Sequence, residues 1–276
     1  MNLRDLTDSS ILVVAHPDDE ILWFSSIVRN VDRIVFCFLE VDGNSAISEG
    51  RKRVLHDFPH KQISTLNIKE GNVFNMADWK HPPPSVDGLE FRSHKRTPSR
   101  KAIYMQNFVE LCERLRQVLK GYRNVVTHNP WGEYGHEEHV QVYRAVKSVQ
   151  AQLGFNMWVS NYYSTRSFRL MESYESGPRA DYVTVPIDKE FAAGVRDLYQ
   201  RHGCWTWYAD FGWFNEESFI RDDGLKYSAT SRGHSFPVNM VRVDFSENPE
   251  ARPVRRLRLL RRVARLLRFP EPEPKT

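Results

Sequence analysis

The sequence predicts an α/β fold of the Rossmann-like type, in which helices cover both faces of a mostly parallel sheet. Continuous apolar runs at residues 11–15 and 33–39 have the pattern of strands that are buried on both faces. The segment between them, residues 20–30, has a helical pattern, so the three form a β-α-β unit with a right-handed crossover. We therefore expect a three-layer α/β/α architecture.

Further elements extend this unit along the chain. Residues 63–68 and 125–128 are predicted strands, whereas residues 102–120 and 137–152 carry apolar side chains at helical spacing. After residue 155 the pattern changes to short strand-like segments, which are expected to add edge strands.

Those later segments are residues 157–164 and 182–187. An aromatic-rich stretch at residues 205–214 follows them, and most of its rings are expected to fill the core.

Length and composition fit one soluble catalytic domain, predicted over residues 1–250, with a tail over residues 251–276. The chain has 276 residues, of which 41% are hydrophobic and 27% charged. No apolar run reaches the roughly 18 residues of a membrane span, and residues 11–15 are too short for a signal-peptide core. Three widely spaced cysteines without a C-x-x-C pair argue against a disulfide framework. We expect a cytoplasmic protein.

The tail is strongly basic and amphipathic. Residues 252–276 contain eight Arg, one Lys and two Glu, so the rest of the chain is slightly acidic within a total charge of +4. At 100° per residue the arginines from 255 to 268 except Arg256 share about one half of a helix. The other half carries Leu257, Leu259, Leu260, Val263, Ala264, Leu266 and Leu267.

Three interpretations of this basic amphipathic helix stay open. It could dock on the domain as an arm, or lie on an anionic membrane at the inner face of the cell. Nucleic-acid binding is the least favoured of the three.

The first group of chemically active side chains follows the first predicted strand. His16, Asp18 and Asp19 lie within four residues at a strand-to-helix turn. An Asp in this place is often only a helix N-cap, and a lone His is often only a hydrogen-bonded surface residue. In doubly wound sheets, however, ligands bind outside the carboxyl ends of the strands.

A second group begins at His128, again after a predicted strand. His136 and His139 are spaced i, i+3, which places both on one face of a helix. Because both groups fall at the same edge of the predicted sheet, His16, His136 and His139 offer imidazoles, and Asp18 and Asp19 offer carboxylates, to one crevice. A catalytic zinc takes three N or O ligands and leaves one position to water, so the groups suffice for a metal and an acid–base pair, although iron(II) or cobalt would also fit.

The two groups together resemble the PIG-L/LmbE-like N-deacetylases. Ala15-His16-Pro17-Asp18-Asp19-Glu20 matches the A-H-P-D-D-E signature of that family, and Gly135-His136-Glu137-Glu138-His139 matches its G-H-x-x-H segment. The resemblance covers roughly residues 8–150. It implies that His16, Asp19 and His139 bind Zn²⁺, that Asp18 is the general base, and that His136 stabilises the tetrahedral intermediate.

The resemblance also suggests substrate contacts. Tyr134 stands where relatives carry a mobile Tyr that reaches the acyl group, and Asp42 with Gly43 is similar to their D-G pair. Arg51 is the best candidate for a contact to the sugar hydroxyls, and Trp131 is expected to line the site. The basic residues 92–101 could meet a phosphate on the substrate or form a solvated loop.

The resemblance therefore implies removal of the N-acetyl group from an N-acetylated amino sugar of the N-acetylglucosamine type, for which a lipid- or nucleotide-linked form is one option. Two alternatives remain. The same site would serve an amidase for a sugar–thiol conjugate or another amide, and an inactive sugar-binding module would keep the same residues. The oligomeric state is not indicated by the sequence.

Overall fold

The computed structural model describes residues 1–276 except 61, 94–96, 177–180, 229–235 and 244–276. The chain forms two compact units, Met1–Trp205 with Gly212–Val243, and Thr206–Phe211 with Asp244–Thr276. In the second unit the ring of Trp207 contacts those of Tyr208 and Phe211 at centroid distances of 6.4 and 5.7 Å. The predicted amphipathic helix at 253–269 lies outside the described residues. The following paragraphs concern the first unit.

A seven-stranded sheet forms the centre of this unit, in the order β10-β11-β7-β6-β1-β2-β3. Five strands run parallel, and β11 pairs antiparallel with both β7 and β10. The strands are β1 (Ser10–Val14), β2 (Arg33–Glu40), β3 (Ile63–Lys69), β6 (Asn124–Thr127), β7 (Asn156–Ser160), β10 (Tyr182–Pro186) and β11 (Glu216–Arg221). The predicted mostly parallel sheet with additional edge strands is confirmed.

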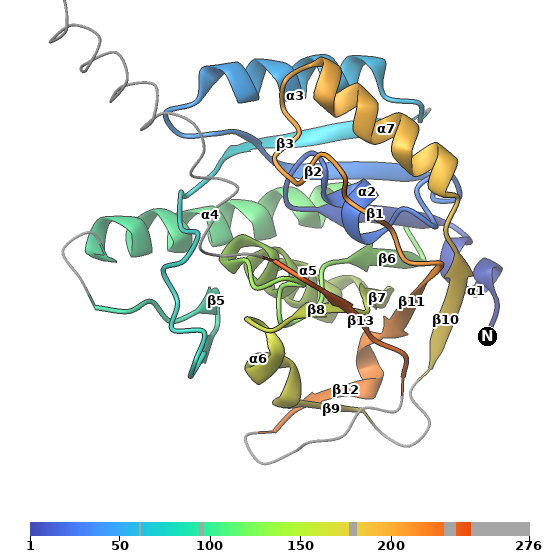
Figure 1. Ribbon diagram of the computed structural model, residues 1–276. Coiled ribbons are helices and arrows are strands. Elements are labelled where there is room, and N and C mark those ends of the chain that lie inside the picture. The colour runs from blue at the N-terminus through green and yellow to red at the C-terminus, as the bar shows by residue number, and fades with distance from the viewer. Residues whose placement is uncertain (61, 94–96, 177–180, 229–235, 244–276) are drawn as a thin grey trace, which may run out of the picture. The chain divides into compact units, whose positions relative to one another are not determined.

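Helices cover both faces of the sheet (Figure 1). One face carries α2 (Asp19–Trp23), α3 (Ser45–Asp57) and α7 (Lys189–Arg201), and the other carries α4 (Thr97–Val118) and α5 (Glu137–Leu153). Because β1 lies between these layers, all five of its residues are buried, as its continuous apolar run predicted. The predicted three-layer arrangement is thus confirmed.

Smaller elements complete the unit. They are α1 (Leu3–Thr7), α6 (Phe168–Glu172), a 3-10 turn at Asp222–Gly224, and three short strand pairs: β4 (Pro84–Ser85) with β5 (Gly88–Leu89), β8 (Tyr162–Ser164) with β13 (Asn239–Val241), and β9 (Tyr174–Ser176) with β12 (Leu225–Tyr227).

Two predicted elements differ from the structure. The helix expected over residues 20–30 ends at Trp23, because the backbone N–H groups of Ser25 and Ser26 donate to the carboxylate of Glu217 at 3.2 and 2.9 Å instead of continuing the helix. The strand expected over 157–164 is interrupted at Asn161, after which β8 leaves the central sheet.

The position of both motifs follows from the strand order. The order reverses between β1 and β6, which are paired side by side with Val13 opposite Thr127. Such a reversal opens a crevice at the carboxyl ends of the two strands. The His16 segment follows β1 and the His128 segment follows β6, so both enter the same crevice.

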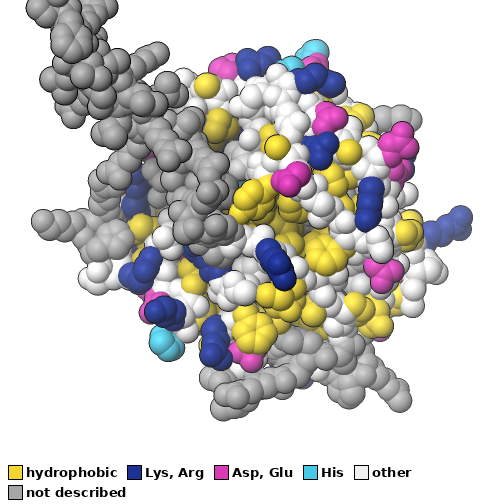
Figure 2. Space-filling model, viewed as in Figure 1, with side chains coloured by type: hydrophobic (Ala, Val, Ile, Leu, Met, Phe, Trp, Pro, Cys, Tyr) yellow, Lys and Arg dark blue, Asp and Glu magenta, His cyan; other side chains and the backbone are white. Residues whose placement is uncertain are grey.

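The surface in Figure 2 shows lysines and arginines interspersed with acidic side chains. Within the described residues no helix has both the length and the apolar character to cross a bilayer.

Candidate metal centre

The turn after β1 orients Asp19. Its Oδ2 atom accepts the backbone N–H of His16 at 2.7 Å, and its Oδ1 atom accepts the indole N–H of Trp23 at 2.9 Å. Trp23 is four residues further along α2, so the helix itself holds the carboxylate in one orientation. Asp19 and His16 are both buried.

Asp18 has an unusual backbone conformation. Its φ of 111° lies in a region that non-glycine residues rarely adopt, and its side chain makes no capping hydrogen bond although it occupies the N-cap position of α2. The carboxylate of Asp18 therefore does not serve as a helix N-cap, which was the simplest alternative to a functional role. Glu20 supports the turn because its Oε2 atom accepts the backbone N–H of Asp18 at 3.0 Å, and its Oε1 atom accepts the hydroxyl of Tyr199 at 2.8 Å.

The loop after β6 places the second motif. The amide of Asn129 donates to the carbonyl of Tyr162 at 2.8 Å, and the loop then turns at Gly132, where φ is +68°. A Cβ atom at Gly132 would lie 2.7 Å from the carbonyl oxygen of His136, so only glycine permits this close approach. His136 becomes the N-cap of α5, and its Nδ1 atom accepts the backbone N–H of Glu138 at 3.1 Å.

The two motifs bring His16, Asp19 and His139 together. One ligand atom from each lies within 4.8 Å of the others. Nε2 of His139 is 3.2 Å from Oδ1 of Asp19, and Nδ1 of His16 is 3.3 Å from Oδ2. Among the described residues, the buried Nε2 of His139 has no hydrogen-bond partner. An orphaned imidazole nitrogen that faces a carboxylate is an arrangement that a cation would complete.

Each imidazole is oriented through its other nitrogen. Nε2 of His16 lies 2.9 Å from Oε2 of Glu138, and Nδ1 of His139 lies 2.8 Å from Oε2 of Glu133. When these nitrogens donate to the carboxylates, Nδ1 of His16 and Nε2 of His139 keep their lone pairs for a metal. This is the carboxylate–histidine arrangement of metal centres.

The charges of the cluster agree with that assignment. Burial raises the pKa of Asp19, but the neighbouring imidazoles outweigh burial and hold it well below its ordinary value. Burial lowers the pKa of His139, which keeps this ring neutral. Burial also lowers the pKa of His16, but Asp19 and Glu138 outweigh it and raise that pKa well above the ordinary value, so a metal must displace a proton there.

The donor set therefore fits zinc. Two imidazole nitrogens and one carboxylate oxygen are the ligands of open, catalytic zinc sites, and the fourth position is left for water or substrate. Zn²⁺ is the cofactor for which this cluster is best suited.

His136 and Tyr134 lie beside the three ligand residues. The ring of His136 stands 4.9 Å from those of both His16 and His139, and the ring of Tyr134 is 5.4 Å from that of His139. Because Nδ1 of His136 accepts a backbone N–H, the proton of its neutral ring is on Nε2. His136 is thus a hydrogen-bond donor next to the metal position.

A wall beside these rings is formed by residues 71–79. The two glutamates of the Gly135–His139 motif hold this wall: Glu138 accepts the backbone N–H of Gly71 at 2.6 Å, and Glu137 accepts that of Ala77 at 2.9 Å and the indole N–H of Trp79 at 3.0 Å. In this segment the ring of Phe74 lies 5.1 Å from the ring of His136, measured between centroids.

Arg51 is connected to the metal centre by Glu70, a residue that the sequence analysis did not identify. Arg51 is buried on α3 and forms an ion pair with Glu70, whose Oε1 atom is 3.8 Å from Nε2 of His16. Glu70 follows β3 directly, at the same edge of the sheet. An acid immediately after a predicted strand was the signal that could have identified it.

Trp131 and Asp42 do not join the centre. Trp131 is fully buried in the hydrophobic core, where its indole N–H donates to the carbonyl of Tyr162 at 2.8 Å, so it offers no face to a substrate. The side chain of Asp42 is 39% exposed and pairs with Lys69 at 2.8 Å. The expectation for Trp131 came from its position between the two groups and that for Asp42 from the family resemblance, and neither fixes the direction of a side chain.

The basic run at residues 92–101 is only partly a loop, because α4 begins at Thr97. Arg100 donates to the carbonyl of Gly71 at 2.9 Å and Lys101 pairs with Glu90 at 2.7 Å. Two of its cations thus already have protein partners.

His128 and Glu133 also belong to the centre, although the sequence analysis gave neither of them a role. The ring of His128 stacks on that of His139 at 4.0 Å, and both rings contact Glu133. Burial raises the pKa of Glu133, but the two imidazoles outweigh burial and lower it to about 2. The position of His128 directly after a buried strand was the available signal.

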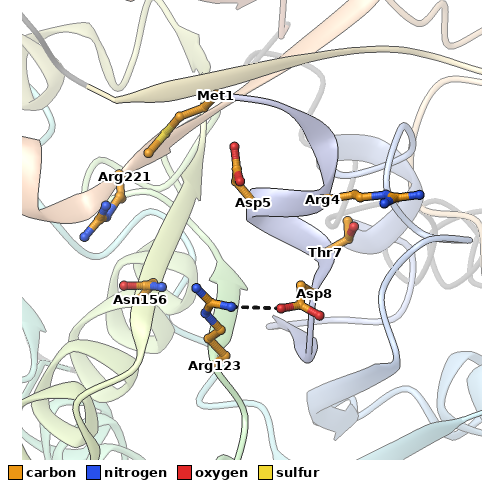
Figure 3. Close-up of a pocket in the computed structure, with 8 residues that line it drawn as sticks. All are labelled: Met1, Arg4, Asp5, Thr7, Asp8, Arg123, Asn156 and Arg221. Carbon is orange, nitrogen blue, oxygen red and sulfur yellow. Dashed lines mark hydrogen bonds and ion pairs between the residues drawn. The ribbon is translucent and has the colours of Figure 1, made fainter.

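A pocket of about 670 Å³ opens at the opposite edge of the sheet, at the amino ends of β1, β6 and β7 (Figure 3). Its lining includes Arg123, which pairs with Asp8 at 3.0 Å. Both side chains are mostly exposed, and none of the residues in the His16 and His139 cluster lines this pocket.

Comparison with known proteins supports the resemblance seen in the two motifs. The chain is 26% identical over 169 residues to 1D-myo-inositol 2-acetamido-2-deoxy-alpha-D-glucopyranoside deacetylase of Corynebacterium diphtheriae, which covers 53% of this chain and 54% of that protein. It is 25% identical over 143 residues to an uncharacterised protein of Acanthamoeba polyphaga mimivirus, over 50% of this chain and 56% of that one. The chain thus spans about half the length of the curated relatives it matches. The first match confirms the resemblance to the PIG-L/LmbE-like family. No family model matches the chain.

Solved structures of similar shape were also found. The zinc-inhibited form of teicoplanin deacetylase matches with a TM-score of 0.47 and 11% identity over 80% of this chain and 100% of that one. The N,N'-diacetylchitobiose deacetylase of Pyrococcus horikoshii matches with a TM-score of 0.41 and 13% identity over 73% and 72% of the two chains.

Proposed function

We propose that this chain is a zinc-dependent N-deacetylase that releases acetate from an N-acetylated amino sugar. The observation that carries the proposal is the cluster of His16, Asp19 and His139 at the point where the strand order reverses, with the orphaned Nε2 of His139 turned towards Asp19. The deacetylase of Corynebacterium diphtheriae, with which the chain shares 26% identity, supports the same reaction class.

His16, Asp19 and His139 would hold the zinc. When bound, zinc supplies a Lewis acid that polarises an amide carbonyl and acidifies water. The chain contributes a rigid ligand set, because Trp23, Glu138 and Glu133 each hold one of the three ligand side chains by a hydrogen bond.

Asp18 would act as the general base that takes a proton from the attacking water. It is adjacent to the ligand Asp19, buried, and not used as a helix cap. Its strained backbone supports this role, since strain of this kind concentrates at functional sites. The same carboxyl, once protonated, can return the proton to the leaving amine.

His136 would stabilise the charge that develops on the amide oxygen. Nδ1 of His136 accepts the backbone N–H of Glu138, so the neutral ring carries its proton on Nε2. A fixed donor beside the reacting carbonyl strengthens its hydrogen bond as the oxygen becomes negative.

Tyr134 and Phe74 would border the acyl group, because both rings lie next to His136, at centroid distances of 5.7 and 5.1 Å. On the side of His16, Arg51 and Glu70 would meet the sugar hydroxyls. A guanidinium and a carboxylate held together offer donors and acceptors at fixed positions, as a polyhydroxylated ring requires.

Acetate release from an N-acetylglucosaminyl compound tests the proposal. The wild-type protein is expected to contain about one equivalent of zinc and to release acetate, whereas Asp18→Asn should retain the zinc and lose activity by roughly 10²- to 10⁴-fold. Asp8→Asn, which removes an exposed carboxylate at the opposite edge of the sheet, is the matched control and should behave as wild type.

A protein that holds no zinc, together with an Asp18→Asn variant that releases acetate at the wild-type rate, would refute the proposal. Release of a thiol compound from a sugar–thiol conjugate, without acetate release, would instead identify the amidase.

We further propose that residues 253–269 bind the enzyme to an anionic membrane surface on the cytoplasmic side. The support is the separation of arginines and leucines on the two halves of the predicted helix. The full chain should sediment with phosphatidylserine-containing vesicles at low salt but not with phosphatidylcholine vesicles. Replacing Arg258, Arg261 and Arg265 by Gln should reduce that binding, and equal binding to both vesicles would contradict the proposal.

A further inference from the structure

The carboxylate of Glu133 accepts four hydrogen bonds behind the metal centre. Its Oε2 atom lies 2.9 Å from Nδ1 of His128 and 2.8 Å from Nδ1 of His139. Its Oε1 atom accepts the backbone N–H of Asn129 at 3.0 Å and the hydroxyl of Ser160 at 2.5 Å. Glu133 has no exposed surface, so these four donors account for its surroundings.

The backbone of Glu133 adopts an unfavourable conformation, which the surrounding contacts must stabilise. Its φ of 47° lies in the left-handed region, which costs a non-glycine residue about 1 kcal/mol or more. The loop from Asn129 to Gly135 nevertheless turns the side chain inward. Such a conformation persists where the surrounding contacts determine it, and here those contacts are the two imidazoles.

The contact with His139 decides which nitrogen of that ring carries the proton. A carboxylate can only accept, so Nδ1 of His139 must donate to Glu133, and Nε2 is left without a proton. Nε2 is the orphaned atom that faces Asp19 at 3.2 Å. The same hydrogen bond fixes the plane of the ring and therefore the direction of the lone pair.

His128 connects this carboxylate to the first motif. Its ring stacks on His139 at 4.0 Å, and its Nε2 atom accepts the backbone N–H of Ala15 at 2.8 Å. Because Nε2 of His128 accepts that N–H, its Nδ1 must donate to Glu133. The buried carboxylate of Glu133 thus orients His139, the ligand of the second motif. Through His128 it is also connected to Ala15, which precedes His16 in the first motif.

We propose that Glu133 is a positioning residue that sets the affinity of the centre for zinc by holding His139 in its ligand tautomer. The inference rests on the metal site of the proposed function, but not on its substrate. Outer carboxylates that orient a ligand histidine typically change metal affinity by roughly 10- to 100-fold when they are removed.

Glu133→Gln is the decisive variant because Gln keeps the shape but loses the pattern of four accepted bonds. Its NH₂ group must face either the two imidazoles or the pair formed by Asn129 and Ser160. If it faces the imidazoles, His139 accepts at Nδ1 and carries its proton on Nε2, where it blocks the metal. We expect zinc affinity, measured by competition with a chromophoric chelator, to fall about 10- to 100-fold.

Glu217→Gln is the matched control. Glu217 is equally buried and accepts hydrogen bonds from Ser25, Ser26 and Tyr162, but it contacts none of the ligand side chains. Its loss should lower stability and leave zinc affinity within about twofold of wild type. Thermal unfolding with and without zinc separates the two effects, because only Glu133→Gln should reduce the rise in Tm that zinc produces.

If Glu133→Gln does not fold, Glu133→Asp and Glu217→Asp provide the same comparison with a shortened carboxylate, and only the former should weaken zinc binding. Zinc affinity within about twofold of wild type in the Glu133 variant, or an equal loss in its Glu217 counterpart, would overturn the inference. Because the readout uses zinc and no substrate, weakened binding without any acetate release would sustain the inference and refute the proposed activity.

Discussion

The two ends of the central sheet carry the same kinds of side chains in opposite environments. At the carboxyl ends, Asp19 and His139 lie 3.2 Å apart with side chains 3% and 0% exposed. At the amino ends, Asp8 and Arg123 lie 3.0 Å apart with side chains 62% and 68% exposed. Charges that are removed from water interact strongly and must be satisfied, whereas exposed pairs are screened. Burial of the charged side chains therefore distinguishes the carboxyl ends of this sheet from the amino ends.

After Asp18, the largest difference between the two ends is expected at His136. His136→Ala removes the donor beside the reacting carbonyl, so kcat should fall by about 10²- to 10³-fold while zinc content stays near one equivalent. Steady-state kinetics with metal analysis measures both. An unchanged kcat would show that His136 does not contact the transition state.

A smaller effect is expected at the ion pair of Arg51 and Glu70. Arg51→Met leaves the Glu70 carboxylate without its partner and should lower the free energy of unfolding by roughly 1–3 kcal/mol. If the pair binds the sugar, KM should also rise with kcat little changed. The double variant with Glu70→Gln serves as the control, because its loss of stability should be less than the sum of the two single losses.

The pH dependence of stability provides a third test, at Glu20. Burial raises its pKa to about 8, so between pH 4.5 and 8 the folded chain binds a proton that the unfolded chain releases. Glu20 should therefore make the metal-free protein less stable as pH rises through this window, by at most about 1.4 kcal/mol per pH unit. Glu20→Gln should flatten the curve in chemical unfolding, and an unchanged slope would contradict the assignment.

The smallest effect is expected at the amino ends of the strands. Arg123→Ala removes an exposed pair and should change the free energy of unfolding by no more than about 1 kcal/mol, with kcat and zinc content as in wild type. A loss of activity in this variant would mean that the pocket in Figure 3 takes part in function, and the contrast between the two ends would fail.

The elements that could be predicted were those with a strong local pattern. Buried runs such as Ile11–Val14 identified the parallel strands, and the two motifs located the metal centre because each follows a strand of the same sheet. The early end of α2 could not be predicted, since it depends on Glu217, 192 residues away in the chain. Glu133 was missed for a related reason. Its side chain points inward because its backbone is left-handed, and no local sequence pattern predicts that conformation. Trp131, expected to line the site, lies in the core, because proximity in sequence does not distinguish a ring in the core from a ring in the crevice.

The hydrogen bond between Glu20 and Tyr199 has a bearing on the synthesis of the chain. These residues are 179 positions apart, so a ribosome that adds about 5–20 residues per second makes Glu20 roughly 10 to 40 s before Tyr199. During that interval the turn that contains Asp18 lacks one of its supports. The nascent chain should therefore complete the support of this turn only after α7 has emerged and packed, when most of the domain has been translated.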